Sequence, residues 1–443
     1  MMDVSNGFDV RGRVLRDGEL APWLAENSLG NRFGLAVAGS DEGHRSKAVA
    51  LAIVAADGDG RYLDLAALTD DDAAALGSWL ADPGPPKAVH RGKWIRHALR
   101  NRGWTLRGVT SDTALAAHLL HPGRRSRELN DLLVHHMRCA LPDETVGLES
   151  VSPSALILRA CAVLDLADVL DEELARIDSS SLMERLELPV QRTLADLEAV
   201  GVAVDPAQFP EGRIHPTYHH TRSATGALSS SDPNLRAIRT RFVAGDGHSE
   251  LLTVRYVALE MRLLAHLSGD AGLTGAQAAH ELRTVAHALA YDWGAGELAA
   301  TLRVSTRDAK ELVLRYLSGP LRESLADSVD AARDSGYAAT LSGRRRYLPD
   351  LNSPDLELRQ AAERAVCVTA LQGGVADIVK TAMISVEQGV TAAGLDSRMV
   401  ALLDDQLVFE VAADERDAVE SLARDQMVCA YELAVPLAVS VVA

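Results

Sequence analysis

The sequence predicts a mixed α/β (α+β) chain made of two parts with different patterns. Strand and helix signals alternate from about residue 30 to 150, which is typical of a sheet with helices on its faces. From 153 to 201, and again from about 281 onward, helical spacing of apolar residues dominates. A strand–turn–strand pattern at 399–411 then predicts a hairpin, and an apolar run at the C-terminus predicts a final strand.

Composition limits the class of protein. With 443 residues, 47% hydrophobic and 24% charged, the chain is long enough for two or three globular domains. No continuous apolar run predicts a membrane span, and the four cysteines form no CxxC pair. We therefore expect reduced, buried thiols in a cytoplasmic protein without a membrane partner. The net charge of −17 argues against a broadly basic nucleic-acid surface but allows a local basic groove.

The elements of the N-terminal part can be placed in order. Two strands, 48–55 and 62–65, are joined by an Asp-Gly turn. A helix capped by Thr69 and Asp72 should end before Pro83, and the short strand 87–90 should follow. The next two helices begin near Gly92 and after Ser111 or Asp112.

A helical region and an irregular region follow. Apolar residues at helical spacing run up to a stop at Gly201: Leu186, Val190, Leu194 and Leu197. Residues 206–242 are rich in Pro, Gly, Ser and His, which indicates extended loop structure. This segment is also locally basic, through Arg213, Arg222, Arg236, Arg239 and Arg241.

In the C-terminal part, strand and helix signals alternate less regularly. A buried strand at 251–256 leads into a helix, and Arg255 sits at their junction with Glu260 a turn and a half further on. A long helical stretch should break near Gly373-Gly374. The pattern at 399–411 predicts a hairpin with Asp404-Asp405 in its turn, followed by a helix from Asp414 and a final strand.

Several of these segments together resemble conserved motifs of the family A DNA polymerases, typified by bacterial DNA polymerase I. The matching segments, in chain order, are GRIHPTYHHTRSATGALSSSDPNLRAI, VRYVALEMRLLAHLSGD, TLSGRRRYLPDLNS, RQAAERAVCVTALQGGVADIVKTAMI and LLDDQLVFEV. Residues 30–175 resemble the RNase H-like 3'–5' exonuclease-type domain of the same enzymes. The resemblance implies a degenerate exonuclease-like domain at 1–178 and a palm with shortened fingers at 179–443, with the helical thumb deleted near 205–212.

The sequence departs from the family where nucleotide transfer takes place. The family holds two divalent metals between two palm aspartates. The second aspartate matches Asp405, next to Asp404, but the first matches Arg255. A guanidinium keeps its charge and offers no lone pair to a metal. We hypothesise that Arg255 pairs with Asp405 or Asp404 in place of the metals. The alternative is that Arg255 points into solvent.

Other family positions are partly retained. In the fingers motif, Arg283 and Tyr291 match, but His287 stands where the family has a Lys for the triphosphate. Ala227 replaces an Arg that contacts the primer end. Three residues match positions that contact the primer–template or screen the sugar 2' group, and could equally be kept for packing: Arg364, Gln372 and Glu260.

The exonuclease-like region lacks the carboxylate cluster that such chemistry requires. Its first strand, RFGLAVAG, has no acidic residue, and Ile95 replaces an aspartate, while Asp165 and Asp168 lack acidic partners. His135-His136 and His219-His220 have no Cys or His partners at ligand spacing, so no metal site is predicted. Arg344–Arg346 could contact nucleic acid or form a solvated turn.

These departures lead to three hypotheses. The first is a catalytically inactive polymerase-like protein that binds DNA weakly, in the primer–template manner, or binds a protein in replication or repair. We expect it to need no cofactor and to be cytoplasmic, either free or associated with the nucleoid. The second is a slow polymerase that uses Mg²⁺ with Asp404, Asp405 and Glu260. The third is a protein–protein scaffold without DNA binding, which the acidic charge favours.

Overall fold

The computed structural model describes residues 8, 10–28, 30–124, 126–142, 151–271, 295–316 and 320–442. The described chain divides into two compact units, with the boundary between Ala199 and Val200. Arg283, His287 and Tyr291, the predicted fingers residues, lie outside the described residues.

The first unit is built on a six-stranded mixed sheet with the order β1-β4-β3-β2-β5-β6. The β4-β3 and β3-β2 neighbours are antiparallel, whereas the β1-β4, β2-β5 and β5-β6 neighbours are parallel. The strands are β1 Arg11–Val14, β2 Phe33–Gly39, β3 Ala48–Val54, β4 Asp59–Asp64, β5 Lys87–Val89 and β6 Val109–Asp112.

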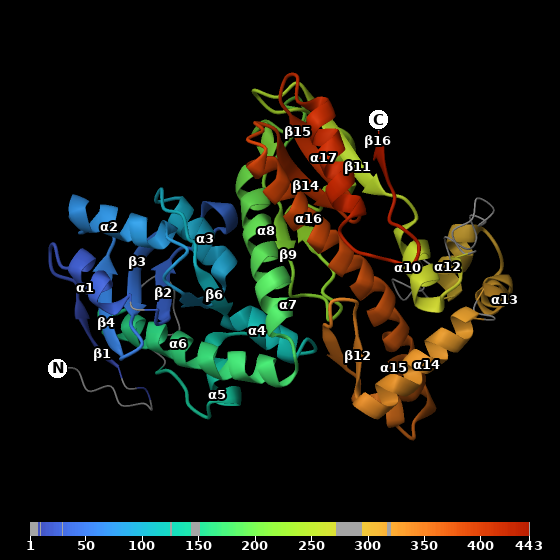
Figure 1. The fold of residues 1–443 in the computed structure, drawn as a ribbon, viewed down its shortest axis with the longest axis horizontal. Helices are drawn as coiled ribbons and strands as arrows, with labels where there is room; N and C mark the ends of the chain where they lie inside the picture. The colour runs from blue at the N-terminus through green and yellow to red at the C-terminus, as the bar shows by residue number, and fades with distance from the viewer. Residues whose placement is uncertain are drawn as a thin grey trace. The chain divides into compact units, whose positions relative to one another are not determined.

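Helices cover both faces of this sheet (Figure 1). On one face α6 packs across the strands so closely that a Cβ at Gly34 would lie 2.2 Å from the Ala160 carbonyl oxygen. The other face buries Trp23, Trp79 and Trp94 from three helices against β2 and β3. The helices are α1 Leu20–Asn27, α2 Asp70–Ala81, α3 Gly92–Arg100, α4 Thr113–Leu120, α5 Leu129–His136, α6 Pro153–Arg176, α7 Ser180–Leu182 and α8 Leu188–Val200.

Local sequence signals account for the helix starts in this unit. The Thr69 hydroxyl accepts a hydrogen bond from the Asp72 N–H at 3.1 Å, so the predicted cap of α2 is confirmed. Asp112 caps α4 by accepting from the N–H groups of Ala114 and Leu115. Asp112 also accepts from Gln191 Nε2 at 2.7 Å, which ties α8 to the N-terminus of α4.

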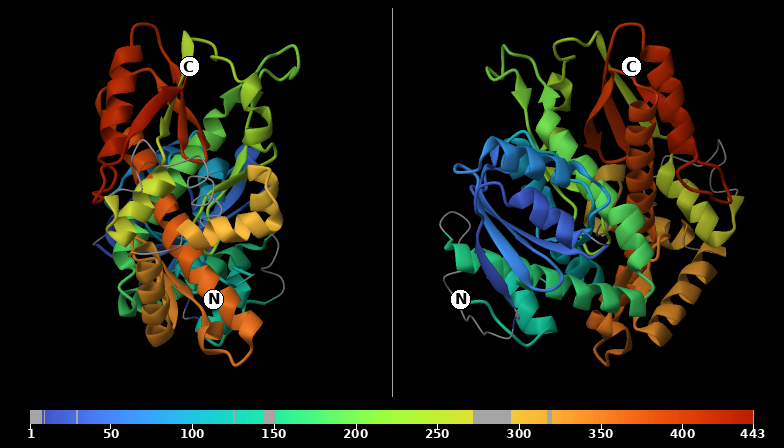
Figure 2. Two further views of the ribbon diagram at one scale, coloured as in Figure 1. Left: turned by 90° about the vertical axis from the view of Figure 1, so that its right-hand side faces the viewer. Right: turned by 60° about the vertical axis from the view of Figure 1, so that its left-hand side comes forward.

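The second unit contains an antiparallel four-stranded sheet with the order β14-β15-β11-β16. Helices α16 and α17 pack on it, and α17 contacts both β11 and β16 (Figure 2). The strands are β11 Glu250–Tyr256, β14 Arg398–Leu403, β15 Gln406–Val411 and β16 Val439–Val442. Three two-stranded pairs complete its strands: β7 Val202–Ala203 with β8 Arg213–Ile214, β9 Thr217–His219 with β10 Ser229–Ser231, and β12 Tyr337–Ala339 with β13 Arg345–Tyr347.

Helices make up the rest of the second unit. They are α9 Leu235–Ile238, α10 Leu259–Ser268, α12 Ala295–Leu302, α13 Thr306–Tyr316, α14 Pro320–Ser335, α15 Leu356–Val368, α16 Gly374–Ala392 and α17 Arg416–Val428. The predicted break at Gly373-Gly374 is wrong, because a π-helical turn, Thr369–Gly373, joins α15 to α16. The glycines serve packing instead: a Cβ at Gly373 would lie 2.3 Å from Thr340 Cγ2.

The continuous helical stretch Leu356–Ala392 is long and apolar enough to cross a membrane, with a mean hydropathy of 1.2 in its most apolar window. The sequence patterns did not predict such a stretch. However, 78% of that window is buried inside the protein, as in the core helix of a globular domain. Of the four cysteines, Cys161 is buried but Cys429 is exposed, so the expectation of buried thiols holds only in part.

The segment 205–212, where the sequence resemblance predicts a deleted thumb, lies in a short connection. Residues 204–212 link the antiparallel strands β7 and β8, and the N–H of Val204 donates to the Gly212 carbonyl oxygen at 3.1 Å. The N–H groups of Gln208 and Phe209 both donate to the Asp205 carbonyl oxygen, which closes the turn. The segment thus satisfies part of its backbone hydrogen bonding locally.

Candidate active site

Two carboxylates occupy the turn between β14 and β15. Asp404 and Asp405 connect Leu403 to Gln406, which are paired in the hairpin register. Asp404 has a φ of 58°, the left-handed conformation that two-residue hairpin turns require and that aspartate tolerates better than most residues. The predicted hairpin is therefore confirmed, and its turn chemistry places both carboxylates at the tip.

Arg255 lies in a row of side chains across the neighbouring strands. In the sheet register it is opposite Gln406 on β15 and Ser440 on β16. Opposed residues of an antiparallel pair project from the same face. Arg255 is exposed, whereas Val254 and Tyr256 on either side are buried. Arg255, which the resemblance assigns to the first palm position, thus projects from a face of the sheet and presents a guanidinium.

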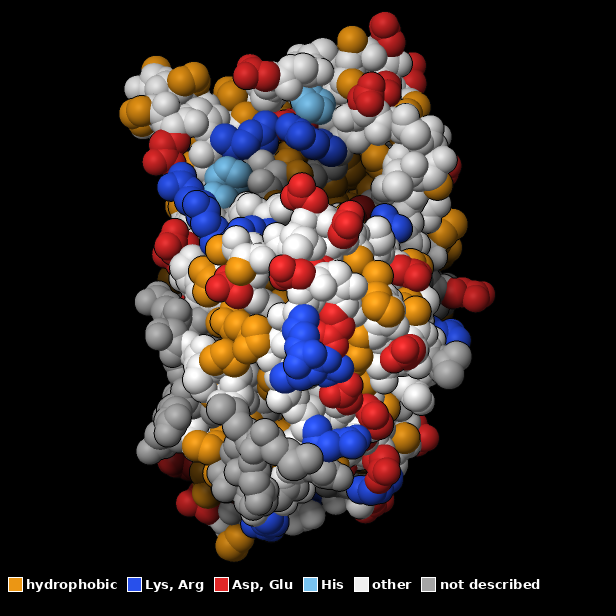
Figure 3. Space-filling model, turned by 90° about the vertical axis from the view of Figure 1, so that its left-hand side faces the viewer, with side chains coloured by type: hydrophobic (Ala, Val, Ile, Leu, Met, Phe, Trp, Pro, Cys, Tyr) orange, Lys and Arg blue, Asp and Glu red, His pale blue; other side chains and the backbone are white. Residues whose placement is uncertain are grey.

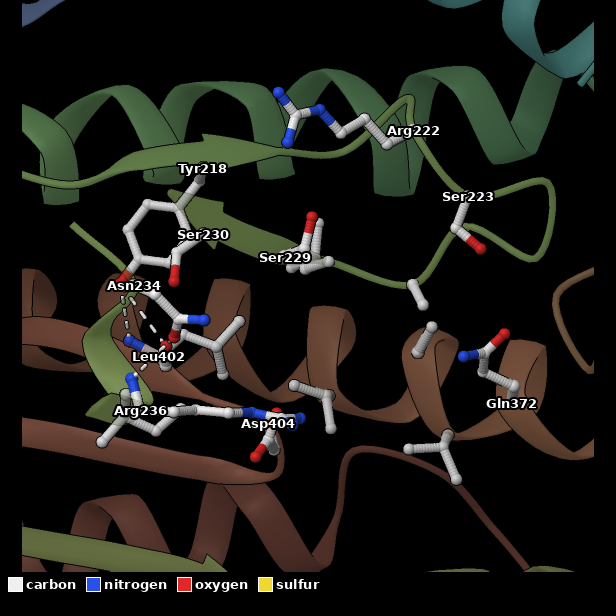
Figure 4. Close-up of a pocket in the computed structure, with 16 residues that line it drawn as sticks. Tyr218, Arg222, Ser223, Ser229, Ser230, Asn234, Arg236, Gln372, Leu402 and Asp404 are labelled. Atoms are coloured by element: carbon white, nitrogen blue, oxygen red, sulfur yellow. Dashed lines mark hydrogen bonds and ion pairs between the residues drawn. The ribbon is translucent and has the colours of Figure 1, made fainter. Parts of the chain in front are cut away.

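The structure corrects the proposed partner of Asp404. The Arg255 Nε donates to the hydroxyl of Ser440, on the neighbouring strand β16, at 3.3 Å. The cation that pairs with Asp404 is Arg236, which comes from α9 (Figure 4). The reason is geometric: Arg255 lies within the strand row beside β16, while Asp404 projects from the end of the hairpin toward α9.

The Asp405 backbone is held by β11, since its carbonyl oxygen accepts from the Tyr256 N–H at 3.2 Å. Burial raises the pKa of the Tyr256 hydroxyl, and the Asp405 charge raises it further. That hydroxyl donates to the Met427 carbonyl oxygen at 2.8 Å. Glu260 follows in the first turn of α10, half-buried, after Ala258 with a φ of 52°. A bent junction therefore connects the Arg255 strand to the Glu260 helix.

A cavity of about 560 Å³ lies beside the turn, entirely within the second unit. Its wall includes Asp404, Arg236, Arg222 and Gln372 (Figure 4). The remaining polar lining comes from hydroxyls and one amide, namely Tyr218, Ser223, Ser229, Ser230 and Asn234. Two guanidiniums, several neutral hydrogen-bonding groups and one carboxylate suit a polar, anionic ligand rather than an apolar one.

The structure places Gln372 and Arg364, two residues that the resemblance assigns to primer–template contacts, at different cavities. Gln372 lies on the π-helical turn, and its side-chain oxygen accepts from the Thr225 hydroxyl at 2.8 Å inside the cavity beside Asp404. Arg364 lies on α15 and lines a different cavity, of about 540 Å³, with Arg333 and Glu363. Ala227, which stands where the family has an arginine, lines the first cavity.

The sequence reasoning missed Arg222 and Arg236 as site residues. Both belong to the basic, irregular segment 206–242, and their clustering was the available signal. Arg344, by contrast, is neither solvated nor exposed: it is 1% exposed. Burial raises the pKa of the nearby Asp377, and the Arg344 charge opposes that shift. The interpretation of Arg344–Arg346 as a solvated turn therefore fails for Arg344.

In the first unit, the strand β2 carries no acidic residue and Ile95 is buried in the core. Asp168 pairs with Arg32 at 3.2 Å, and Asp171 pairs with the same guanidinium at 2.6 Å. Burial raises the pKa of Asp165 and that of Asp168. The carboxylates on α6 are thus neutralised in part by an arginine.

The interpretation of His135 and His136 as lacking partners needs correction. His121, fourteen positions earlier in the chain, lies beside them, and one ligand atom from each of the three rings lies within 4.8 Å of the other two. The fold brings them together because His121 ends α4 and the pair ends α5. His219 is different: its Nε2 hydrogen-bonds the Ser231 hydroxyl at 2.7 Å.

The sequence and fold can now be compared with known proteins. Residues 190–282 and 276–443 match the model of DNA polymerase family A, and residues 37–146 match the DNA polymerase I ribonuclease H-like domain. This chain belongs to DNA polymerase family A. DNA polymerase I of Mycobacterium tuberculosis is 39% identical over 585 residues, covering 99% of this chain and 65% of that protein, and its Mycobacterium leprae counterpart is 37% identical.

A solved structure is also similar. The polymerase domain of Pol1 from M. smegmatis, in complex with DNA primer–template and dNTP, matches with a TM-score of 0.87 and 42% identity, covering 97% of this chain and 98% of that one. The predicted fold, an RNase H-like domain followed by a family A polymerase domain, is confirmed. This chain spans 65% of the length of the mycobacterial relatives, and the 585-residue match exceeds its 443 residues, so those relatives carry internal sequence that it lacks.

The two divalent metals that the family implies do not fit the residues at this turn. The available carboxylates are Asp404, Asp405 and Glu260, and Asp404 is already neutralised by Arg236. By the sequence resemblance, Arg255 stands at the position of the first palm aspartate, and it lies opposite Gln406, the residue that follows Asp405. A permanently charged guanidinium repels a dication and cannot coordinate it.

Proposed function

We propose that this chain is a DNA polymerase I-like protein that binds primer–template DNA without catalysing nucleotide transfer. The observation that carries the proposal is that Arg255, at the position that the resemblance assigns to the first metal ligand, lies opposite Gln406 on β15, while Arg236 pairs with Asp404 in the adjoining turn. Metal-assisted transfer needs two carboxylates that bridge the ions. Here the residue at the first ligand position is cationic, and the neighbour of Asp405, the remaining aspartate, is neutralised by an arginine.

The family membership supports DNA as the ligand class, since the similar Pol1 domain is described in complex with primer–template and dNTP. Arg222 and Arg236 supply the charge for a phosphate backbone at the cavity. On the face shown in Figure 3, Lys and Arg side chains gather in local groups among acidic ones, so a net charge of −17 does not make every surface acidic.

The short 204–212 connection supports weak rather than tight binding. Affinity for a duplex depends on how many phosphates the protein neutralises. A turn of nine residues offers far less contact than a helical thumb. We also propose that the RNase H-like unit is structural, because Arg32 pairs with two carboxylates of α6, Asp168 and Asp171. We further propose that the protein acts in replication or repair in the cytoplasm.

Two assays on the full chain test this proposal. Fluorescence anisotropy with labelled primer–template should show an affinity that falls as the salt concentration rises. This loss of affinity should be several-fold larger for the wild type than for the Arg222→Ala/Arg236→Ala double variant. Arg307→Ala, an exposed arginine on α13, is the matched control and should behave like the wild type. Binding that is unaffected by the double variant, or absent altogether, would favour the protein scaffold.

Primer extension with Mg²⁺ or Mn²⁺ then separates the inactive protein from a slow polymerase. No extension is expected at any enzyme concentration that saturates the DNA. Extension that is lost in the Asp405→Ala variant would mean that Asp404, Asp405 and Glu260 assemble metal by themselves, and the proposal of an inactive protein would be wrong.

A further inference from the structure

Three imidazoles converge in the first unit. His121 directly follows the last residue of α4 as its C-cap, and His135 and His136 are the last residues of α5. The ring centroids of His135 and His136 are 4.6 Å apart. The ring centroid of His121 lies 5.5 Å from that of His135 and 5.9 Å from that of His136. One ligand nitrogen from each ring lies within 4.8 Å of the other two. Among the described residues, no other group of three potential ligands is this close.

His136 is held in the orientation of a metal ligand. Its Nδ1 lies 3.0 and 3.1 Å from the two carboxylate oxygens of Glu173 on α6, and the side chain is 2% exposed. With Nδ1 donating to the carboxylate, Nε2 carries the lone pair. That Nε2 is buried, and within the described part of the chain it has no hydrogen-bond partner.

A buried imidazole nitrogen without a partner is unusual, because buried polar atoms are nearly always satisfied. A carboxylate that hydrogen-bonds the far nitrogen of a histidine is the usual support of a metal-bound imidazole, since it fixes the tautomer and raises the basicity of the ligand nitrogen. The two observations are independent, and both point to an electron-pair acceptor at His136 Nε2.

We propose that His121, His135 and His136 bind a borderline transition-metal dication such as Zn²⁺, with Glu173 as the positioning residue. Three neutral nitrogen donors suit zinc, which takes four ligands in a tetrahedral arrangement and often leaves one position to water. Nitrogens 2.0–2.1 Å from zinc would be about 3.4 Å apart. The spacing of up to 4.8 Å therefore has to close, and the exposed His135 side chain is free to rotate for this.

The surrounding charges set the expected strength of this site. Glu173 favours a dication, whereas Arg124 and Arg138 act on the His135 ring and oppose one. The site is therefore weaker than a closed structural zinc site with thiolate ligands. Replacing the exposed Arg124 with Ala should tighten binding several-fold, because it removes a repulsive charge without touching a ligand.

Isothermal titration of the metal-free full chain with Zn²⁺ alone tests the proposal. One ion per chain is expected for the wild type. His135→Ala and His136→Ala should each weaken binding at least tenfold, and Glu173→Gln should weaken it by about 10–100-fold while the three nitrogens stay in place. His44→Ala, a half-buried histidine elsewhere in the same unit, is the control and should bind like the wild type.

A second readout guards against variants that fail to fold. Zn²⁺ should raise the melting temperature of the wild type and of His44→Ala but not that of His135→Ala, whose exposed side chain contributes little to the core. The proposed site would be overturned if His135→Ala and His136→Ala had the same zinc affinity and the same thermal shift as the wild type. It would also be overturned if the wild type did not bind one zinc ion per chain. Neither result depends on whether the chain binds DNA.

Discussion

Arg236 donates to the carboxylate of Asp404, so an arginine from the irregular segment before β11 neutralises one of the two adjacent carboxylates in the β14–β15 turn. The pair forms part of the wall of the 560 Å³ cavity that Arg222 and Gln372 also line. Its two members should act oppositely on an anionic ligand. Arg236 attracts phosphate. Asp404 repels phosphate and, by pairing with the Arg236 guanidinium, makes that group less available to a ligand.

This opposition gives a paired prediction. Arg236→Gln should weaken primer–template binding by about 3–10-fold and reduce the salt slope by about one. Asp404→Asn should tighten binding by a similar factor, because it releases the guanidinium and removes a repulsive charge. Anisotropy titrations at two or more salt concentrations measure both effects. If both variants bind alike, the cavity is not a phosphate site.

Restoring the missing aspartate should not restore activity. Arg255→Asp returns a carboxylate to the strand opposite Gln406, yet Arg236 still pairs with Asp404 and residues 204–212 remain a short turn. Primer extension by this variant should stay at background. Extension comparable to that of an active family A polymerase would show that the single Arg255 substitution accounts for the loss.

Glu410 should be a stability determinant of the second unit. It is 0% exposed, and its two carboxylate oxygens accept from Arg213 at 2.7 Å and from Arg398 at 2.7 Å. Arg213 also donates to the carbonyl oxygens of Val200 and Gly201, so Glu410 connects the sheet to the start of the short hairpin. Glu410→Gln should lower the free energy of unfolding by about 2–4 kcal/mol, because two guanidiniums lose a buried counter-charge.

Urea denaturation followed by circular dichroism measures this change. The control is Glu311→Gln, which removes an exposed ion pair with Arg307 on α13 and should change the free energy of unfolding by less than about 0.5 kcal/mol. Equal effects of the two substitutions would contradict the role assigned to Glu410.

Asp72 should make the first unit sensitive to acid. Its carboxylate is buried and accepts from the Gly18 N–H at 2.8 Å, the Leu20 N–H at 3.1 Å and the Thr69 hydroxyl at 2.7 Å. Burial tends to raise the pKa of Asp72, but these hydrogen bonds outweigh it and the pKa is lowered. The carboxylate therefore stabilises the fold at pH values above its unfolded pKa of about 3.9, and this contribution is lost as the pH falls through the lower folded pKa.

The variant Asp72→Asn should be less stable than the wild type by about 1–3 kcal/mol at pH 7, because its amide group faces backbone donors. The difference in unfolding free energy should shrink below pH 4. Asp71→Asn, an exposed neighbour in the same helical turn, should match the wild type throughout. A difference for Asp72→Asn that is independent of pH would argue against a hydrogen-bonded carboxylate.

Local signals explain what the sequence could predict. Thr69 and Asp112 mark helix starts through their own hydrogen bonds, and Asp404-Asp405 marks a hairpin turn because its backbone conformation is set by the two residues themselves. Tertiary packing explains what it could not. Glycines at 373–374 suggested a break, but contacts with Thr340 and Leu263 account for them inside a continuous helix.

The candidate site divides in the same way. The place of Arg255 on β11, opposite the first residue after the Asp404-Asp405 turn, follows from motif order and strand register. The pairing of Asp404 with Arg236 depends on a loop whose path no periodicity defines. The convergence of His121 with His135 and His136 likewise depends on how the ends of α4 and α5 meet, which spacing along the chain does not reveal.

The most direct test of the central claim is the location of metal at the β14–β15 turn. A crystal of the full chain with primer–template, soaked in Mn²⁺ and a nucleotide, would show the ions by anomalous scattering. We expect no ion within coordination distance of Asp404 or Asp405, with Arg236 still paired to Asp404. Two ions bound by these carboxylates, with the nucleotide phosphates between them, would contradict the account.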